Sequence, residues 1–331
     1  MTLLRDLRRH GARVLVPLVA AAALLSACGG GTSQVQAFVP ARLLVLGDEA
    51  SMVIDDGSAD GFKYSVNDRS GTTAGKCLLQ PTVAQQVARH YGMVFAACNP
   101  TAATPRAFIQ ARLGAKVDDA TTGLQAQLTA AGSVGNTDMV LVMIGANDII
   151  DLYGQKLAGA LTAAQATAEA IRRGRVAATQ INRILGSGAR ALVVTIPDMG
   201  KSPYALQAAT TDPGADTLMS TWSTEYNAAL RLGIDATDFD GRNYGLVLAD
   251  DVIAAMERFP TSYLTSPANV KTGVCTLASL PQGCLVVTGA TAPAVNLAPN
   301  THLWASDRHF GPVAHTFIGT QAVSRAVNNP F

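Results

Sequence analysis

The sequence predicts an α/β fold: a three-layer α/β/α sandwich with a mainly parallel sheet. Short apolar runs without a polar face alternate with longer helical patterns along most of the chain. Strands buried on both faces produce such runs, and helices between them make right-handed crossovers. About 300 residues follow the N-terminal segment, enough for one large domain with a substantial core.

Five apolar runs are the predicted strands, and they cover residues 43–46, 93–97, 139–144, 191–196 and 245–249. The clearest helical patterns cover residues 82–90, 161–185 and 218–232. In a doubly wound sheet, ligands lie beyond the carboxyl ends of the strands. We therefore expect functional residues directly after Leu46, Ile144 and Ile196.

The first 27 residues have the pattern of an export signal. Residues 1–13 carry four arginines and one acid, and an uncharged apolar run follows at 14–27, too short to span a bilayer as a stable helix. The run ends in Leu25-Ser26-Ala27-Cys28, which resembles the lipobox of bacterial lipoproteins. That resemblance implies cleavage before Cys28 and attachment of lipid, palmitate included, to this cysteine. The alternative is an ordinary cleaved signal with an incidental cysteine.

The predicted organisation follows from this segment. We expect a lipoprotein signal peptide at 1–27, a lipidated cysteine and glycine-rich tether at 28–40, and one folded domain at 41–331. The predicted protein is exported and lipid-anchored, in the outer membrane facing the periplasm or at the cell surface, because Gly29 rather than an aspartate follows the cysteine. Lys and Arg (25) nearly balance Asp and Glu (24), with no basic run beyond the signal, which argues against nucleic-acid binding. We expect a monomer that meets the membrane through its lipid anchor.

Four cysteines lie in the predicted domain: Cys77, Cys98, Cys275 and Cys284. Exported proteins form disulfides, and four cysteines allow three connectivities. Loop closure favours near neighbours, so we expect Cys77–Cys98 and Cys275–Cys284. A zinc site is the weaker interpretation, because the spacing is not C-x2-C and no histidine lies beside them.

Polar motifs follow the predicted strands where ligands are expected. The segments are Gly47-Asp48-Glu49-Ala50-Ser51, Ala111-Arg112-Leu113-Gly114, Gly145-Ala146-Asn147-Asp148 and Ser306-Asp307-Arg308-His309. In this order they resemble the blocks of the SGNH/GDSL superfamily of esterases and lipases, and the likeness runs from about Leu43 to about His315. It implies an SGNH/flavodoxin-like sandwich that hydrolyses ester bonds without a cofactor.

The resemblance also assigns roles. In acyl transfer a nucleophile attacks the carbonyl, an imidazole moves its proton, a carboxylate orients the imidazole, and fixed donors stabilise the oxyanion. By resemblance His309 is the base, and the Asn147 amide and Gly114 N–H are the oxyanion donors. Asp307 stands near enough to orient the imidazole. The alternatives are that Asn147 caps the following helix, that Asp307 is a solvated surface acid, and that His302 or His315 is the base.

Two positions depart from the family pattern. Glu49 stands where the reactive serine is expected, and Ser306 stands where the aspartate is expected. A carboxylate is a poorer nucleophile toward ordinary esters. Ser51 is a substitute only if its loop is rerouted, because two residues of chain span roughly 6 Å, about twice the reach of a hydrogen bond.

The sequence therefore leaves two main functions open. The first is an ester hydrolase acting on acyl or acetyl groups of lipid or envelope glycan, which uses Ser51, or water activated by Glu49 and His309. The second is a non-catalytic envelope lipoprotein that keeps the fold for binding or structure, with Glu49 and His309 as an ion pair.

A metal-dependent enzyme is a third, weaker hypothesis. Several carboxylates follow the same strand ends, and hard cations prefer oxygen ligands. Short acids near turns more commonly bond to the loop backbone, so we expect no metal. The carboxylates concerned are Asp48, Glu49, Asp148 and Asp307.

Overall fold

The computed structural model describes residues 37–70, 75–286 and 300–328. All of them belong to one compact unit, residues 37–331. The predicted signal peptide, Cys28 and most of the predicted tether lie outside the described residues. Within the described ranges, no helix is both long and apolar enough to cross a membrane.

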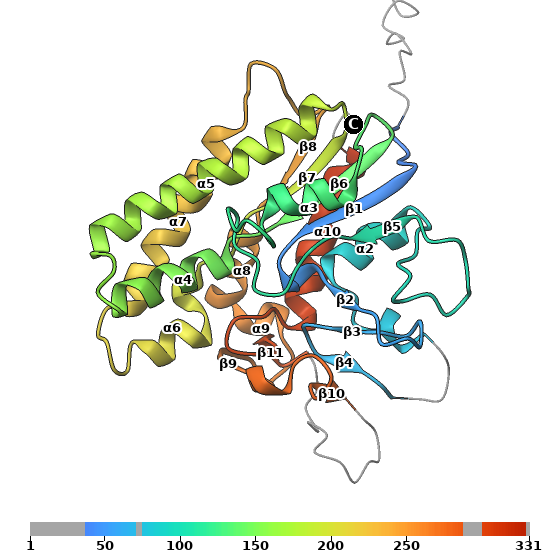
Figure 1. Cartoon of the computed structure of the whole chain (residues 1–331). Coiled ribbons are helices and arrows are strands. Elements are labelled where there is room, and N and C mark those ends of the chain that lie inside the picture. The colour runs from blue at the N-terminus through green and yellow to red at the C-terminus, as the bar shows by residue number, and fades with distance from the viewer. Residues whose placement is uncertain (1–36, 71–74, 287–299, 329–331) are drawn as a thin grey trace, which may run out of the picture. The chain divides into compact units, whose positions relative to one another are not determined.

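A five-stranded parallel sheet forms the centre of the domain (Figure 1). Each neighbouring pair in it is parallel. This confirms the predicted α/β class with a mainly parallel sheet. The strands, in spatial order, are β5 (Ala107–Ile109), β1 (Arg42–Gly47), β6 (Asp138–Met143), β7 (Arg190–Val194) and β8 (Tyr244–Val247).

The strand order reverses between β1 and β6. From β1 the chain runs to the edge strand β5 and then returns past β1 to β6 on its other side. Such a switch point is where open α/β sheets bind ligands, because the loops diverge there. Gly47 at the end of β1 is level with Met143 at the end of β6. The first and third motifs therefore leave the sheet side by side.

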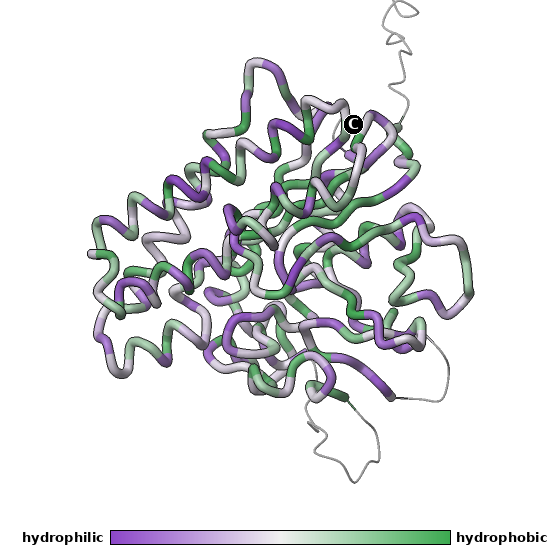
Figure 2. Tube along the Cα trace, in the orientation of Figure 1, coloured by the Kyte–Doolittle hydropathy of each residue, from purple (hydrophilic) through white to green (hydrophobic). Residues whose placement is uncertain are grey.

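Helices cover both faces of the sheet, and successive residues of β1 point to opposite faces. Leu44 and Leu46 pack in one core cluster, whereas Leu43 and Val45 pack in the other. Figure 2 shows the consequence: the strands are hydrophobic, and the helices alternate along their length. One face carries α3 (Leu124–Ala131), α4 (Ala146–Leu157), α5 (Ala163–Gly186) and α7 (Ala215–Gly233), and the other carries α2 (Val83–His90), α8 (Ala249–Arg258) and α10 (Pro312–Asn328).

Short elements complete the fold around the carboxyl edge of the sheet. The antiparallel pair is β2 (Val53–Ile54) with β3 (Phe62–Lys63), and the small parallel pairs are β4 (Asn67–Asp68) with β10 (Leu285–Val286) and β9 (Asn269–Gly273) with β11 (His302–Trp304). The short helices are η1 (Glu49–Ser51), η2 (Lys76–Leu78), η3 (Met199–Lys201), α6 (Pro203–Ala208), α9 (Pro260–Tyr263) and η4 (Leu277–Ser279).

The three predicted helices are confirmed as α2, α5 and α7. Two of them begin at a capping box, in which a threonine hydroxyl and a glutamine side chain each bond to the other's backbone N–H. Thr82 and Gln85 form this box at the start of α2, and Thr162 and Gln165 form it at the start of α5. Such boxes satisfy N–H groups that the helix itself leaves unpaired.

The prediction of a strand at 93–97 is wrong. Phe95 makes only isolated bridges, to Cys98 and to Ala107, and the chain turns between Phe95 and Cys98. Met93 and Phe95 are buried against the face that carries α2. The run is therefore apolar because it is buried, and the edge of the sheet is formed by β5 instead.

The predicted boundary between tether and domain also shifts. Phe38, inside the range assigned to the tether, packs against the core cluster that contains α2 and α10. The guanidinium of Arg190 lies 5.6 Å from the centre of its ring. The folded body therefore begins before residue 41.

Both predicted disulfides are confirmed. Cys77 bonds to Cys98, and Cys275 bonds to Cys284. The first joins η2 to the turn after Phe95, and the second joins the segment after β9 to the segment before β10. The first closes a loop that contains α2, and the second closes a loop that contains η4.

Candidate active site

A fixed turn at the end of β1 places Glu49. Gly47 has φ +135°, and a Cβ there would lie 1.8 Å from the carbonyl oxygen of Met143, so only glycine fits. The Gln127 side chain holds the peptide groups of Gly47, accepting from its N–H (2.7 Å) and donating to its C=O (2.8 Å). Asp48 caps η1 by accepting from the N–H of Ala50. The turn is thereby held by β6, by α3 and by its own cap.

The Glu49 carboxylate is bound by three segments that are distant in sequence. Its Oε2 accepts from the N–H of Gly114 (2.8 Å) and from the side-chain amide of Asn147 (2.9 Å). Its Oε1 lies 3.1 Å from Nε2 of His309. Two fixed donors that converge on one oxygen are what an oxyanion hole requires. In this structure the oxygen between these two donors belongs to Glu49.

Asn147 is held in place by the start of α4. Gly145 precedes it with φ +130°, and a Cβ on this glycine would lie 2.5 Å from the Tyr226 ring. The Tyr226 hydroxyl donates to the carbonyl of Ile144 (3.0 Å), which closes the turn from the other side. The cap position of α4 is Gly145, while the Asn147 amide donates to Glu49. In this structure the Asn147 side chain donates to Glu49 and does not cap the helix.

His309 lies in the loop after β11, with a partner at each ring nitrogen. Nε2 must carry a proton, because the Glu49 carboxylate it faces can only accept. Nδ1 lies 2.7 Å from Oγ of Ser306, and the Ser306 hydroxyl donates to Asp307 (3.3 Å). The ring also stacks on Tyr64, with centroids 5.7 Å apart. The site is therefore a chain of contacts from Glu49 through His309 and Ser306 to Asp307.

Within the described residues, Asp307 contacts the imidazole only indirectly, through Ser306. Its carboxylate is partly exposed and pairs with Arg308 at 2.9 Å. Its backbone carbonyl accepts from the N–H of Tyr204 (2.8 Å), which docks the loop on the start of α6. The contact with Nδ1 is made by the neighbouring hydroxyl of Ser306.

The two neighbouring carboxyl groups of the turn have pKa values shifted in opposite directions. Burial raises the pKa of Glu49, but the hydrogen bond and charge of His309 and two backbone N–H groups outweigh burial, so the net pKa lies below its usual value. Burial, and then the charge on Glu49, raise the pKa of Asp48 well above its usual range. The surroundings therefore favour the ionised form of Glu49 over that of Asp48.

Ser51 is not brought to the imidazole. It ends η1, its side chain is fully buried, and its Oγ has no hydrogen-bond partner among the described residues. The nucleophile position in front of His309 is occupied by the Glu49 carboxylate. No rerouted loop of the kind that Ser51 would need is present in this region.

The other two candidate histidines have different surroundings. His315 is fully buried in α10, and burial lowers its pKa to about 3, so it stays neutral. His302 is half-buried in β11, and its Nδ1 contacts the hydroxyl of Thr301. Among these three, His309 is the one that contacts Glu49.

The carboxylates considered as metal ligands have protein partners. Asp148 accepts from the N–H of Val117 and faces the Arg173 guanidinium at 3.3 Å. Asp48 accepts from Ala50, as described above. Across residues 37–70, 75–286 and 300–328, no three His, Cys, Asp or Glu side chains come close enough together to hold a metal ion.

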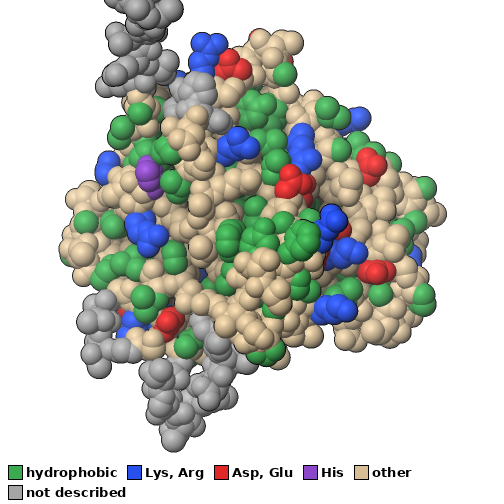
Figure 3. Space-filling view, turned by 180° about the vertical axis from the view of Figure 1, so that it is seen from behind, with side chains coloured by type: hydrophobic (Ala, Val, Ile, Leu, Met, Phe, Trp, Pro, Cys, Tyr) green, Lys and Arg blue, Asp and Glu red, His purple; other side chains and the backbone are tan. Residues whose placement is uncertain are grey.

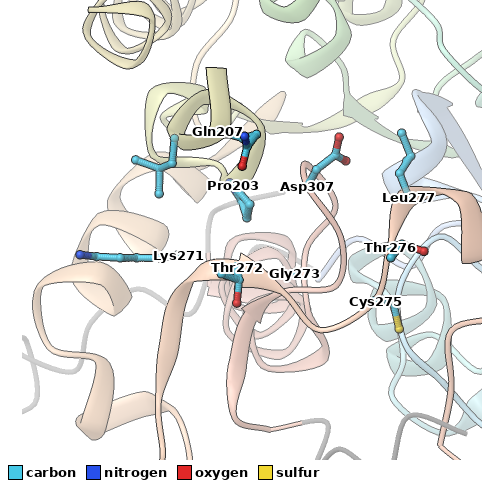
Figure 4. Close-up of a pocket in the computed structure, with 10 residues that line it drawn as sticks. Pro203, Gln207, Lys271, Thr272, Gly273, Cys275, Thr276, Leu277 and Asp307 are labelled. Atoms are coloured by element: carbon cyan, nitrogen blue, oxygen red, sulfur yellow. The ribbon is translucent and has the colours of Figure 1, made fainter. Parts of the chain in front are cut away.

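A hollow of about 500 Å³ adjoins the site (Figure 4). Residues of α6 and β9 form its walls, and Asp307 points toward it from the loop that carries His309. A Cβ on Gly273 of β9 would lie 2.6 Å from Cα of Ser306, so this wall packs directly on the loop. The hollow therefore meets the candidate site at Asp307, while Glu49 and His309 are not part of its lining. The lining includes Pro203, Gln207, Lys271, Thr272, Thr276 and Asp307.

Three residues of the site were not identified as such from the sequence. Ser306 appears there only as a departure from the family pattern, although its position three residues before His309 was a usable signal. Asp48 before a short turn is a typical cap. Tyr64 has no sequence signal, because its place against His309 depends on how β3 packs at the sheet edge.

Comparison with known proteins gives one family. Residues 44–266 match the family described as GDSL-like lipase/acylhydrolase. The matched range contains Glu49, Gly114 and Asn147 and ends before Ser306 and His309. No curated protein matches the chain.

Two solved structures resemble the fold at low identity. One is LAE5, an alpha/beta hydrolase enzyme from the metagenome of Lake Arreo, Spain, with 13% identity, a TM-score of 0.44, and coverage of 89% of this chain and 98% of that one. The other is phospholipase A1 from Streptomyces albidoflavus NA297, with 14% identity, a TM-score of 0.36, and coverage of 69% and 87%.

Proposed function

The chain belongs to the GDSL-like lipase/acylhydrolase family, and on that premise we propose that it hydrolyses esters with Glu49 and His309 as its reactive pair. One observation carries the proposal. Two donors converge on one oxygen position, at 2.8 and 2.9 Å, and the imidazole lies 3.1 Å from the adjacent oxygen. Acyl transfer needs this combination of oxyanion donors and a base.

The proposed reaction begins when an ester displaces Glu49 from the hole. The ester carbonyl takes the place of Oε2 between Gly114 and Asn147, and the carboxylate turns aside with a water molecule beside His309. Nε2 of His309, once its proton has passed to Glu49, removes a proton from this water, which attacks the carbonyl carbon. The imidazole passes that proton to the departing alcohol, and Glu49 returns the first proton to Nε2 as it re-enters the hole, which restores the doubly protonated imidazole of the starting state. Ser306 holds the ring throughout by its contact with Nδ1.

The proposed substrates are acyl or acetyl esters of lipid or envelope glycan. The export signal and Cys28 support this class, since they would hold the domain at the outer membrane, facing the periplasm or the cell surface. Incorporation of labelled palmitate into the wild type but not into Cys28→Ala would test the anchor. Equal labelling of the two proteins would contradict it.

Hydrolysis of p-nitrophenyl acetate and butyrate tests the activity. We expect wild-type turnover and a loss of at least about 100-fold in His309→Ala, because a general base typically contributes that much. His302→Ala is the matched control and should keep full activity, since His302 contacts Thr301 and lies outside the chain of contacts. Equal rates for the wild type and His309→Ala would refute the proposal.

A second candidate function, a non-catalytic binding or structural protein, is favoured by one observation. Glu49 and His309 are 5% and 4% exposed, and Glu49 closes the hole that a substrate oxygen would enter. On this hypothesis the pair is structural, and the wild type is inert across short-chain esters. If folded wild-type protein releases no p-nitrophenol, neither in an initial burst nor in the steady state, this function is favoured over the first.

A further inference from the structure

We propose that Glu49 is a covalent nucleophile toward saturated carbon: its Oε1 attacks an alkyl carbon that carries an oxygen leaving group, as in an epoxide. Oε2 stays in the hole throughout. The resulting glutamyl ester is then hydrolysed by water that His309 activates. This activity goes beyond the ester hydrolysis proposed above and does not require the carboxylate to move.

The first reason for attack at saturated carbon is that the hole is already filled. When a nucleophile attacks a carbonyl, negative charge develops on the substrate oxygen, which must find donors. Here the donors of Gly114 and Asn147 are already bound to Oε2 of Glu49. When a nucleophile attacks saturated carbon, no oxyanion forms on the substrate. The filled hole then orients the carboxylate instead of obstructing it.

The proton at His309 is the second reason. Nε2–H lies 3.1 Å from Oε1 and is therefore beside any carbon that Oε1 attacks. The proposed first step starts from the doubly protonated imidazole, with Nδ1 against Oγ of Ser306 and Nε2 against Glu49. In the first step the Oε1–carbon bond forms and the carbon–oxygen bond of the epoxide breaks. The electron pair moves to the epoxide oxygen, which takes the Nε2 proton.

The second step uses the hole as acyl transfer does, but on the protein's own ester. The ester carbonyl oxygen is Oε2, which already lies between Gly114 and Asn147. Neutral His309 removes a proton from water, the oxygen of which adds to Cδ of Glu49 while the donors stabilise charge on Oε2. The bond from Cδ to the alkylated oxygen breaks, and the departing alkoxide takes the proton from His309. The new carboxyl group then returns its proton to the imidazole, and the net reaction is epoxide plus water to diol.

The residues that contact the buried carboxylate lie nearer to the surface than Glu49 itself, which is 5% exposed. Gly114 is exposed, and Asn147 is half-buried, as is Tyr64 beside His309. The proposed reaction therefore requires a small alkyl compound that approaches from the side of these residues.

The test follows the oxygen atom in the full-length wild type. The protein, in excess over 1,2-epoxyhexane, reacts once in oxygen-18 water, and the peptide that contains Glu49 is then weighed. We expect one oxygen-18 atom in Glu49, because water attacks Cδ and not the epoxide. Label found in the diol alone, or no diol and no label, would overturn the inference.

Two variants sharpen the result. His309→Gln should form no diol, because it removes both the proton donor of the first step and the base of the second. Glu49→Gln should form no adduct, whereas the control Glu257→Gln, which alters a half-buried glutamate in α8, should label like the wild type. Because the wild-type experiment needs no variant to fold, unfolding of Glu49→Gln leaves the test intact. The p-nitrophenyl assay is read separately, so loss of either activity is distinguishable from loss of the other.

Discussion

Ser306 contacts His309 at Nδ1, the ring nitrogen opposite Glu49, with 2.7 Å between Oγ and Nδ1. In this site a neutral hydroxyl therefore stands where a carboxylate would orient the imidazole of a serine hydrolase. The negative charge lies on the other side of the ring, at Glu49. The imidazole thus keeps two partners, while the positions of the acid and of the hydroxyl are exchanged.

The contact between Ser306 and His309 predicts that substitutions of Ser306 and of Asp307 lower turnover by different amounts. Ser306→Ala should lower the turnover of p-nitrophenyl acetate about five-fold, because a neutral hydrogen bond contributes about 1 kcal/mol to holding the ring. Asp307→Asn should have a smaller effect, since Asp307 reaches the ring only through Ser306. Comparison of the two kcat values checks this. A larger loss in Asp307→Asn would mean that the carboxylate acts directly.

Emptying the hole should change which reagents the site accepts. In Glu49→Ser, the donors of Gly114 and Asn147 lose their internal ligand and the new hydroxyl faces His309. We expect this variant to be labelled by a fluorophosphonate, whose phosphonyl oxygen can enter the vacated hole, whereas the wild type is not labelled. Intact-protein mass spectrometry measures the adduct. Glu49→Ala should stay unlabelled, and an unlabelled but folded Glu49→Ser would contradict the assignment of the hole.

Removing one member of the buried Glu49–His309 pair should lower the free energy of unfolding. His309→Ala leaves the Glu49 carboxylate buried without the imidazole, and removing one partner of a buried pair typically costs about 3–5 kcal/mol. We expect the lower end, because Gly114 and Asn147 still donate to it. The double variant Glu49→Gln with His309→Gln should lose less than His309→Ala alone. Urea unfolding gives these free energies. If the loss in the double variant equals the sum of the losses in the two single variants, Glu49→Gln and His309→Gln, the two side chains are not coupled.

Lys63 should make the stability depend on pH above neutrality. It is fully buried, and burial lowers its pKa from 10.5 to about 7. Between these values the unfolded chain binds a proton that the folded chain does not, so the free energy of unfolding rises with pH from about 7 toward 10.5. Below pH 7 both the folded and the unfolded chain bind this proton. Burial of the charged lysine then lowers the free energy of unfolding by its full amount, on the order of 5 kcal/mol.

Urea unfolding as a function of pH isolates this contribution. Lys63→Met should abolish the rise, whereas Lys271→Met, at an exposed lysine, should keep it. The Nζ atom of Lys63 donates to the carbonyls of Cys77 and Leu79, so Lys63→Met also loses two hydrogen bonds. That loss shifts the whole curve without changing its slope. A parallel rise in Lys63→Met would disprove the prediction.

The sheet and the location of the site were predictable because both depend on local sequence. Buried parallel strands are continuous apolar runs, and their carboxyl ends meet at one edge. This places Gly47, Gly145 and the residues after them together without knowledge of any contact. The run at 93–97 shows the limit, because burial against the α2 face produces the same apolar pattern as a strand.

The pairing of Glu49 with His309 was among the alternatives read from the sequence, whereas the other contacts within the site were not predictable, because they depend on paths of loops that are fixed elsewhere. Gly114 meets Glu49 because the N–H of Arg112 bonds to the carbonyl of Gly47 at 3.0 Å, which draws the second loop across the end of β1. Ser306 rather than Asp307 faces Nδ1 because the N–H of Ala305 bonds to the carbonyl of His309 at 2.7 Å, which closes the loop into a tight turn. Neither backbone bond leaves a pattern in the sequence.

The oxygen of Glu49 between Gly114 and Asn147 has a consequence for competing anions. A free carboxylate, such as the acid released from an ester, must displace a carboxylate that is tethered in place and therefore present at a high effective concentration. Water and dilute fatty acids therefore compete poorly for the two donors. The protein is thereby expected to tolerate carboxylic acids that would occupy an open hole.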